Sequence, residues 1–466
     1  MSMGNMCITI ILLALWSHAW LRKREPKSLL NLSISLLVIV SLPSYGLVPY
    51  VGSPTKAYLL GSAIFLTTLL TSISLYRLSP FHPLSRYPGP WQCRLTKLWG
   101  TYIAWNGKPQ VYYKKLHDQY GAIVRIGPNE LSVIDADLIP NILGASGMPK
   151  GPMWGGRRIL PSKNWNRNNS LTSVRDLLPW NAAFKPSSVA GYEGMLIARA
   201  EQFINNSRTS AILETLHWDR FGGVYSLMRD GDIEQVLLKM RRGVFMPSIS
   251  QHIPWLLGAL HAMPFVSSDT RAFGLFGIEQ AKKRASMQND ILRKDLFYYL
   301  LEDTKMSVLS KLVSSALLAI VAGSDTTSSN ETLRLQPPIP TSLQRAPALG
   351  SGGKALSPDM HSCSGSPWII HRCPRYFSPD PDRFWPDRWL NQRSFPFQRG
   401  QLTVQEKPLA MIELRYLTCS LVRTFDMSFD GRYNPAQWED SLVDRFVMLK
   451  GKLPVQLNLR KVNQSL

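Results

Sequence analysis

The sequence lacks any pair of cysteines at the spacing of a metal-binding or redox motif. Its five cysteines are scattered over 466 residues, and no two of them form a Cys-x-x-Cys pair. This pattern argues against a disulfide framework and against a cysteine-based zinc site, and it suits a domain that faces the reducing cytosol. The cysteines are Cys7, Cys93, Cys363, Cys373 and Cys419.

Acidic residues are also scarce. The chain has 32 Asp and Glu against 53 Lys and Arg, which gives a formal net charge of +21. The basic residues are spread along the chain rather than gathered in a run, and no zinc finger or other nucleic-acid module is present. We therefore expect an anionic membrane and an acidic redox protein as partners, and no nucleic acid. A hydrophobic content of 45% is enough for a large core.

The N-terminal 78 residues contain three apolar stretches, each near the length that crosses a bilayer. No small-residue cleavage site precedes Arg22, so we expect an uncleaved membrane anchor with up to three spans in residues 1–78. The stretches are residues 3–20, 29–51 and 57–76.

The basic cluster at residues 22–27 predicts the orientation of this anchor. By the positive-inside rule the cluster stays in the cytosol, and two further crossings return the chain to the same side. Pro43 and Pro49 make the second crossing the weakest, and a re-entrant or interfacial segment is the alternative.

A proline-rich segment at residues 79–90 follows the anchor and predicts a stiff hinge. After it, residues 108–120 have the amphipathic pattern of a helix. Residues 121–134 form two β-rich runs around a Gly-Pro-Asn turn, which predicts a hairpin. The rest of the chain, residues 91–466, is expected to be the main domain.

An apolar helical stretch near residue 320 is interrupted by the small and polar run Ala-Gly-Ser-Asp-Thr-Thr. Gly323 lets a flat ligand approach the backbone, and Asp325 and Thr326 stand in succession where they can relay protons. A helix kink with hydroxyl groups bonded to the preceding turn is the plainer alternative, and the run alone favours it.

The residues that follow predict a buried ionic cluster. Glu331 and Arg334 lie three residues apart, so they share one helix face, and a proline pair then ends the helix. A downstream arginine, either Arg388 or Arg383, can complete an Arg-Glu-Arg cluster.

These three motifs, in this order, resemble those of the cytochrome P-450 superfamily of haem-thiolate monooxygenases, in particular its fungal membrane-bound members. The run at Asp325 resembles the oxygen-activating motif, Glu331 to Arg334 resembles the ExxR motif, and residues 384–389 resemble F-x-P-E-R-F/W. That register makes Arg388 the arginine of the cluster. The resemblance extends over about residues 86–459 and implies a mainly α fold with a small β-rich side region, behind N-terminal transmembrane helices.

The resemblance also implies a haem cofactor, electrons from NADPH through a cytochrome P-450 reductase, a lipophilic small-molecule substrate, and an endoplasmic-reticulum membrane location with the domain facing the cytosol. Trp180 resembles a tryptophan that lies against a haem propionate, although Ala182 stands where relatives often have arginine, and a core tryptophan is an equal alternative. The implied residues are Asp325 and Thr326 for proton delivery, Glu331, Arg334 and Arg388 for the haem-side scaffold, and Gly323, Trp180, Arg345 and Gly400 for cofactor binding.

The haem-binding loop departs from the family pattern. Residues 397–410 align with it without a gap, which places Val404 where the family has the cysteine that ligates iron. Valine has no lone pair to donate, and axial thiolate drives O–O cleavage in this chemistry. Cys419 lies on a later helix and is no substitute, and Cys363 and Cys373 are expected to be exposed loop thiols without a metal role.

A second departure is the junction at residues 330/331. The family separates the two motifs there by further helices of about 30 or more residues, so a deletion is expected at this point. Two interpretations remain open. The first is a fungal-type monooxygenase that hydroxylates a lipophilic small molecule, as in secondary metabolism. The second is a catalytically inactive, membrane-anchored pseudoenzyme or a misassembled gene product. A multispanning protein with an unrelated domain would require the ordered motifs to be a coincidence.

Overall fold

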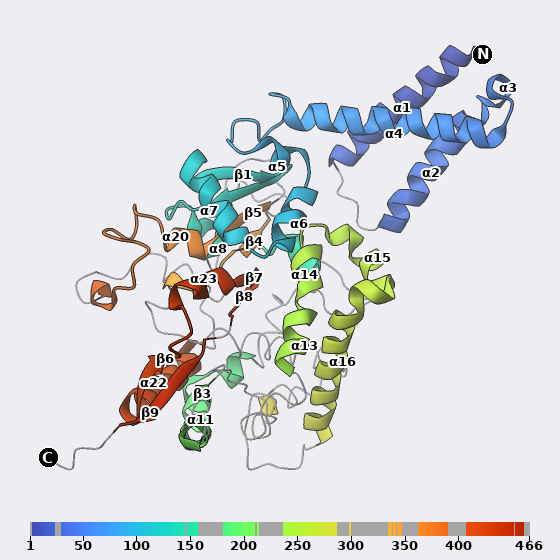
Figure 1. Cartoon of the computed structure of the whole chain (residues 1–466). Helices are drawn as coiled ribbons and strands as arrows, with labels where there is room; N and C mark the ends of the chain where they lie inside the picture. The colour runs from blue at the N-terminus through green and yellow to red at the C-terminus, as the bar shows by residue number, and fades with distance from the viewer. Residues whose placement is uncertain are drawn as a thin grey trace.

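In a computed structural model, the N-terminal helices of the chain lie at one side of a larger, mainly helical body that carries small sheets (Figure 1). This confirms the predicted fold class. The structure describes residues 2–23, 29–144, 147–156, 180–209, 212–213, 236–286, 298–299, 334–337, 339–341, 343–346, 362–389, 407–451 and 453–460.

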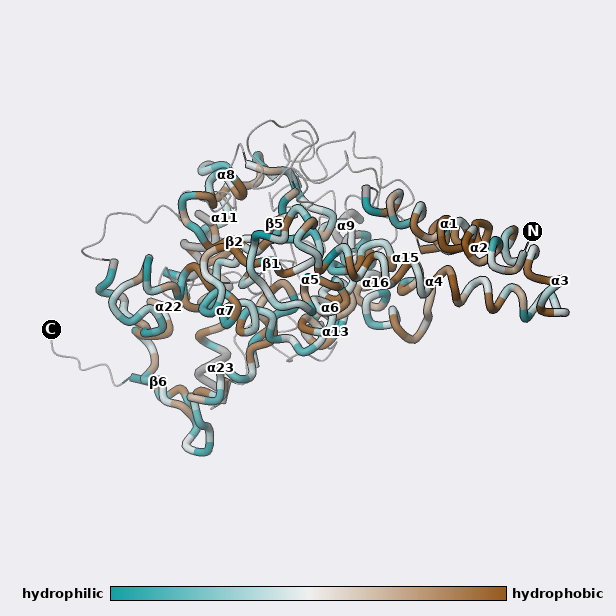
Figure 2. The backbone as a smooth tube through the Cα atoms, turned by 90° about the horizontal axis from the view of Figure 1, so that it is seen from above, coloured by the Kyte–Doolittle hydropathy of each residue, from teal (hydrophilic) through white to brown (hydrophobic). Residues whose placement is uncertain are grey.

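The N-terminal part, residues 2–78, is built on two long helices, α1 (Met3–Lys23) and α4 (Pro54–Leu78), which pack against each other. Both are long and apolar enough to cross a membrane, and their outer faces are uncovered. Figure 2 shows this region as the most hydrophobic part of the tube, at the side of the body. Small and apolar side chains, among them Ala14 and Phe65, form the contact between the helices.

The stretch at residues 29–51, expected to be the weakest of the three crossings, is not one continuous helix. Helix α2 (Leu29–Tyr45) has 17 residues and ends at a turn, after which α3 (Val48–Val51) begins. Pro49 lies in the first turn of α3, where its missing N–H and fixed φ are tolerated. The described residues therefore contain two candidate spans and one shorter apolar helix.

Residues 79–90 lead into three helices, α5 (Trp91–Leu95), α6 (Leu98–Trp105) and α7 (Pro109–Tyr120). Helix α7 confirms the amphipathic helix expected at 108–120. The predicted hairpin is also present: β1 (Ile123–Gly127) pairs antiparallel with β2 (Glu130–Val133) around a turn at Pro128.

The hairpin is half of a four-stranded sheet with the order β1-β2-β5-β4. Strand β5 (Ser362–Gly365) runs parallel to β2, and β4 (Leu343–Arg345) runs antiparallel to β5. Helices α8 (Ile139–Leu143) and α20 (Pro367–Ile370) contribute apolar side chains to the same core. Segments more than 200 residues apart in sequence thus share one core.

Of the remaining helices, α11, α13, α16 and α22 lie in the lower part of the body in Figure 1. Apolar positions at helical spacing predict helices at residues 233–246 and 409–425; α13 and the start of α14 lie in the first range, and α22 confirms the second. These elements are α9 (Met153–Gly156), α11 (Pro186–Thr209), α13 (Val236–Gly243), α14 (Phe245–Ser250), η2 (Pro254–Leu256), α15 (Leu257–Ala262), α16 (Pro264–Ser286), η3 (Pro386–Trp389), α22 (Lys407–Thr424), η4 (Pro435–Gln437) and α23 (Trp438–Ser441).

The family resemblance implies that the last strands, near residues 446–457, close the small sheet, but the described C-terminal strands do not join the β1–β2 sheet. Among the described residues, strands β7 (Val443–Arg445) and β8 (Val447–Leu449) pair with each other alone, whereas β9 (Val455–Leu459) joins β6 (Phe425–Phe429) and β3 (Ile212–Leu213). Leu457 of β9 packs on Phe425 and Leu421, so a local apolar cluster beside α22 attracts this strand.

Candidate functional site

The side chains of Arg334 and Arg388 converge on one turn of the chain, residues 379–383. Arg334 is 2% exposed, and it donates from Nη1 to the Pro381 carbonyl oxygen (2.5 Å) and from Nη2 to that of Arg383 (2.9 Å). Arg388, 4% exposed, donates from Nη2 to the carbonyl oxygens of Pro379 (3.1 Å) and Asp380 (3.0 Å). Two buried cations therefore hold the backbone of a single turn.

Arg383, the other arginine considered from sequence, occupies a different position. Its side chain is exposed, and only its carbonyl oxygen takes part, as an acceptor for Arg334. Arg388, and not Arg383, is therefore the buried arginine that lies beside Arg334. Glu331, the acid expected between the two buried arginines, lies outside the described residues.

His371 and Arg372, which no motif singled out, complete this arrangement. Arg372 donates from Nη1 to the Leu335 carbonyl, forms an ion pair with Asp382 (Nε to Oδ1, 3.1 Å), and lies 4.1 Å from the centroid of the Trp368 ring. Burial lowers the pKa of Arg372 to about 10, against the opposing effect of Asp382. Because its partners lie on separate segments of the chain and one of them is a backbone carbonyl, no sequence pattern predicts this role.

Arg345 has the features of an anion-binding side chain. It lies on β4 with 6% of its surface exposed, and its Nε is buried without a hydrogen-bond partner among the described residues. Burial lowers its pKa. A buried donor without an acceptor is costly, so an anionic group that reaches this Nε is favoured.

Trp180 occupies a core position just before α11. It is 7% exposed, and its ring stacks on Phe184 with the centroids 6.1 Å apart. No hydrogen bond or ring contact joins Trp180 to Arg345 in the described part of the chain. The two interpretations made from sequence, a propionate contact and a core tryptophan, both remain compatible with this placement.

The other predicted site residues lie outside the described residues, and so does the junction at 330/331. They are Gly323, Asp325, Thr326, Glu331, Gly400 and Val404.

Cys363 is fully buried in β5, which corrects the expectation of an exposed loop thiol. Its Sγ lies 3.6 Å from the Sδ of Met148, and burial together with the nearby charge of Glu130 raises its pKa to about 12. Cys419 is exposed on α22, and Cys373 is half-buried. No cluster of three metal-binding side chains occurs in the described ranges.

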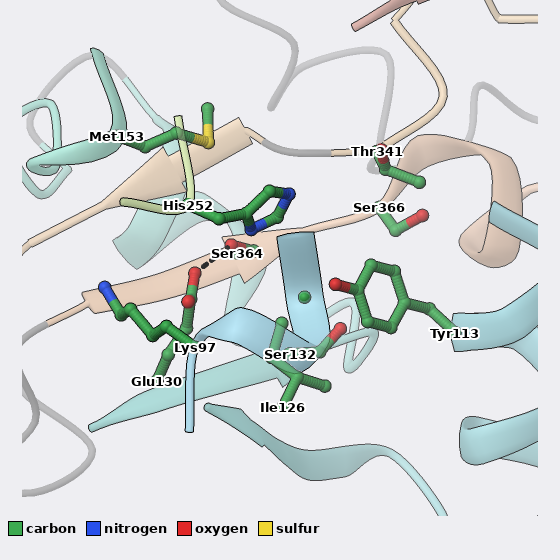
Figure 3. Close-up of a pocket in the computed structure, with 11 residues that line it drawn as sticks. Lys97, Tyr113, Ile126, Glu130, Ser132, Met153, His252, Thr341, Ser364 and Ser366 are labelled. Atoms are coloured by element: carbon green, nitrogen blue, oxygen red, sulfur yellow. Dashed lines mark hydrogen bonds between the residues drawn. The ribbon is translucent and has the colours of Figure 1, made fainter. Parts of the chain in front are cut away.

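A small polar cavity lies between the β1–β2–β5 sheet and α7 (Figure 3). Glu130 lines it, and its Oε1 accepts hydrogen bonds from Gln344 Nε2 (2.6 Å) and Ser364 Oγ (3.0 Å). Tyr113 lines the cavity from α7, and burial raises its pKa. The volume open to the centre of a water molecule is about 20 Å³. The cavity therefore suits a water molecule rather than an organic substrate.

The cytochrome P450 family model matches residues 329–457, the region that contains Arg334, Arg345 and Arg388. Cytochrome P450 67 of Uromyces fabae is 27% identical, with 94% of this chain and 97% of the relative covered. Tryprostatin B 6-hydroxylase of Aspergillus fumigatus is 25% identical, with coverage of 85% and 84%. Cytochrome P450 monooxygenase lcsK of Purpureocillium lilacinum is 25% identical, with coverage of 90% and 86%.

Proposed function

The chain belongs to the cytochrome P450 superfamily, and from this premise we propose that it is of the monooxygenase lineage, whose reaction is the haem-dependent hydroxylation of a lipophilic small molecule in fungal secondary metabolism. The convergence of Arg334 and Arg388 on one turn is the observation that carries the proposal, since it builds the scaffold that the family resemblance implies. One similar protein is a tryprostatin B 6-hydroxylase, which supports hydroxylation as the reaction.

The family implies a haem, and the described residues fit its carboxylate side. Arg345 offers a buried Nε without a partner, which suits a propionate, and Trp180 is the second candidate for that side. When bound, the haem would supply oxygen activation. The chain's own part is to position the cofactor and to deliver protons, which we assign to Asp325 and Thr326.

The residues that would ligate the haem iron fit the cofactor less well, because Val404 stands at the position of the thiolate ligand. This observation favours a second candidate function, a catalytically inactive pseudoenzyme or a misassembled gene product. The alignment with the first relative extends over 543 positions, more than the 466 residues of this chain, so that relative has residues without a counterpart here. This difference supports our proposal that segments are missing, with 330/331 as the expected place.

We propose that α1 and α4 anchor the protein in the endoplasmic-reticulum membrane, with residues 91–466 in the cytosol beyond the hinge at 79–90. The basic chain would then receive electrons from NADPH through a cytochrome P450 reductase, an acidic partner. Two helices of sufficient length and hydropathy support the membrane assignment.

Haem binding by the purified full chain tests this function. We expect the apoprotein to take up haem, with a Soret band that grows to saturation. The variant Arg345→Gln should bind haem at least about tenfold more weakly, because a buried charge-assisted hydrogen bond is lost. The exposed Arg432 provides a matched control, Arg432→Gln, which should bind as the parent does. A parent chain that fails to bind haem would contradict the proposal.

A further inference from the structure

Helix α16 ends in a basic run that closes on a serine. Its last residues read Lys-Lys-Arg-Ala-Ser, from Lys282 to Ser286, and Met287 follows in the sequence. No other Ser or Thr of the chain has basic residues at both the second and the third position before it. Charge patterns of this kind select the substrates of basophilic protein kinases, whose clefts carry acidic side chains.

The serine and the lysines before it are exposed. Ser286 Oγ donates a hydrogen bond to the Lys283 carbonyl oxygen (2.7 Å), its one partner in the part of the chain that the structure describes. Lys282 and Lys283 form no ion pair within the described ranges. The hydroxyl group and both cations are therefore accessible to another protein.

The end of α16 projects beyond the helix that packs against it. Thr270 of α16 donates to the Gly243 carbonyl oxygen at the end of α13 (3.0 Å). Further along α16, the ring centroid of Phe276 lies 5.8 Å from Nζ of Lys239, which comes earlier in α13, so the two helices are antiparallel. Helix α13 begins at Val236, less than one turn before Lys239. Its described part therefore ends before the last turn of α16, as Figure 1 shows.

A serine at this position can enter a kinase cleft at low cost. Kinases bind the acceptor serine in an extended segment, so the helical turn that holds it must open. The last carbonyl groups of a helix have no partner within the helix, and helix ends open at the lowest free energy. Ser286 is the final residue of α16, so its presentation breaks little structure.

The helix dipole offers a simpler explanation of the basic run. Cations in the last turn of a helix stabilise its negative end, and this effect alone accounts for the presence of lysine and arginine there. It does not account for the acceptor serine directly after them or for the apolar Met287 that follows. The exposed hydroxyl group and the order of the residues together favour a kinase site.

The same lysines suit the phosphorylated product. Lys282 and Lys283 stand four and three residues before Ser286, so they share a side of the helix with it. A phosphate on Oγ would therefore have two ammonium groups within reach of charge-assisted hydrogen bonds. These pairs oppose the repulsion between the phosphate and the negative end of the helix.

We propose that Ser286 is a phosphorylation site for a basophilic serine/threonine kinase. The kinase transfers the γ-phosphoryl group of magnesium-bound ATP to Ser286 Oγ. The bond between that phosphorus and the bridging oxygen of ADP breaks, a phosphorus–Oγ bond forms, and an aspartate of the kinase accepts the hydroxyl proton. The site does not depend on haem binding, and its use in a cell rests on the cytosolic orientation that we propose for residues 91–466.

Phosphorylation of the purified full chain in detergent tests the site. The probe is the catalytic subunit of cyclic-AMP-dependent protein kinase with radiolabelled ATP, and tandem mass spectrometry locates the phosphate. We expect label on Ser286 and its loss in Ser286→Ala. Ser268→Ala is the matched control: Ser268 is exposed on the same helix and donates to the Phe265 carbonyl oxygen (3.3 Å), but no basic residue precedes it closely. Absence of label in the parent, or undiminished label in Ser286→Ala, would overturn the proposal.

The charge pattern is tested with the serine retained. Lys283→Gln combined with Arg284→Gln should lower the initial rate of phosphorylation severalfold, because the acidic cleft of the kinase loses its partners. Arg432→Gln, which changes an exposed arginine elsewhere, should leave the rate as in the parent. An equal rate in the double variant would contradict recognition through the basic run.

The folded state is tested with the same kinase. The native chain should be labelled below its unfolding temperature, and the thermal transitions of Ser286→Ala and the parent should coincide. Label that appears only after the chain is unfolded would overturn an accessible site at the end of α16.

Sealed microsomes that contain the chain separate the site from its orientation. Added kinase should label Ser286 without detergent. Labelling that requires detergent would refute the cytosolic orientation, and with it the use of Ser286 by cytosolic kinases, whereas the purified chain reports the site alone.

Discussion

Arg334 and His371 form a reciprocal pair through their backbone carbonyls. Arg334 donates from Nη1 to the His371 carbonyl oxygen (2.8 Å), and His371 Nδ1 lies 3.0 Å from the carbonyl oxygen of Arg334. Since a carbonyl only accepts, Nδ1 carries the proton, which fixes the tautomer of the buried ring. The pair connects the ExxR arginine to the segment that leads into the turn at 379–383.

Loss of this arginine is expected to destabilise the domain strongly. Arg334→Ala removes three charge-assisted hydrogen bonds and leaves the carbonyls of His371, Pro381 and Arg383 without this donor. We expect a loss of about 3 kcal/mol or more in the free energy of unfolding, measured by urea titration of the full chain in detergent. Arg432→Ala, at a residue whose side chain is almost fully exposed, should change it by less than about 0.5 kcal/mol. Similar small effects from both substitutions would contradict the role of Arg334.

The stability of the β1–β2 hairpin is expected to depend on pH through His117. This ring donates from Nδ1 to the Gly121 carbonyl oxygen (2.8 Å), and its Nε2 accepts from Ser132 Oγ (2.8 Å). Burial lowers its pKa below the unfolded value of 6.5, so the unfolded chain takes up a proton first as the pH falls. The stabilisation is therefore complete above pH 6.5 and is lost progressively below it.

Thermal unfolding at about pH 7.5 and about pH 5.5 measures this dependence. The parent should unfold at a lower temperature at the acidic pH, and His117→Asn, which retains a donor for Gly121, should show a smaller difference between the two. An unchanged pH difference in His117→Asn would assign the dependence to other groups.

Much of the fold could be predicted from sequence because its local signals are strong. The Gly-Pro-Asn turn predicts the β1–β2 hairpin, and the apolar spacing after residue 407 predicts α22. The position of β9 could not be predicted, because its pairing with β6 is a tertiary contact that depends on the apolar cluster at Phe425. The burial of Cys363 could not be predicted for the same reason. The run Ser-Cys-Ser-Gly has no strand pattern, and its pairing with β2 buries it.

The residues of the candidate site also divide into those that the sequence predicts and those that it does not. Arg334 and Arg388 could be found because they belong to spaced motifs. His371 and Arg372 could not, because each bonds to a backbone carbonyl 37 residues earlier in the chain, a contact that leaves no mark on the sequence.

Restoring a sulfur ligand is expected to change the iron chemistry. Val404→Cys supplies a thiol at the position that the family uses for the axial thiolate. We expect this variant to shift the Soret band of the bound ferric haem toward that of a thiolate complex, whereas Val404→Ser, of similar size but without sulfur, should leave it as in the parent. Identical spectra for all three proteins would show that position 404 does not reach the iron.

The carbon-monoxide difference spectrum of the dithionite-reduced full chain tests the central claim most directly, namely that the chain has the cytochrome P450 scaffold but no thiolate donor at position 404. We predict that the parent lacks the red-shifted Soret band of thiolate ligation and that Val404→Cys acquires it. The presence of that band in the parent would contradict the claim, since it would show that another cysteine ligates the iron in an active monooxygenase.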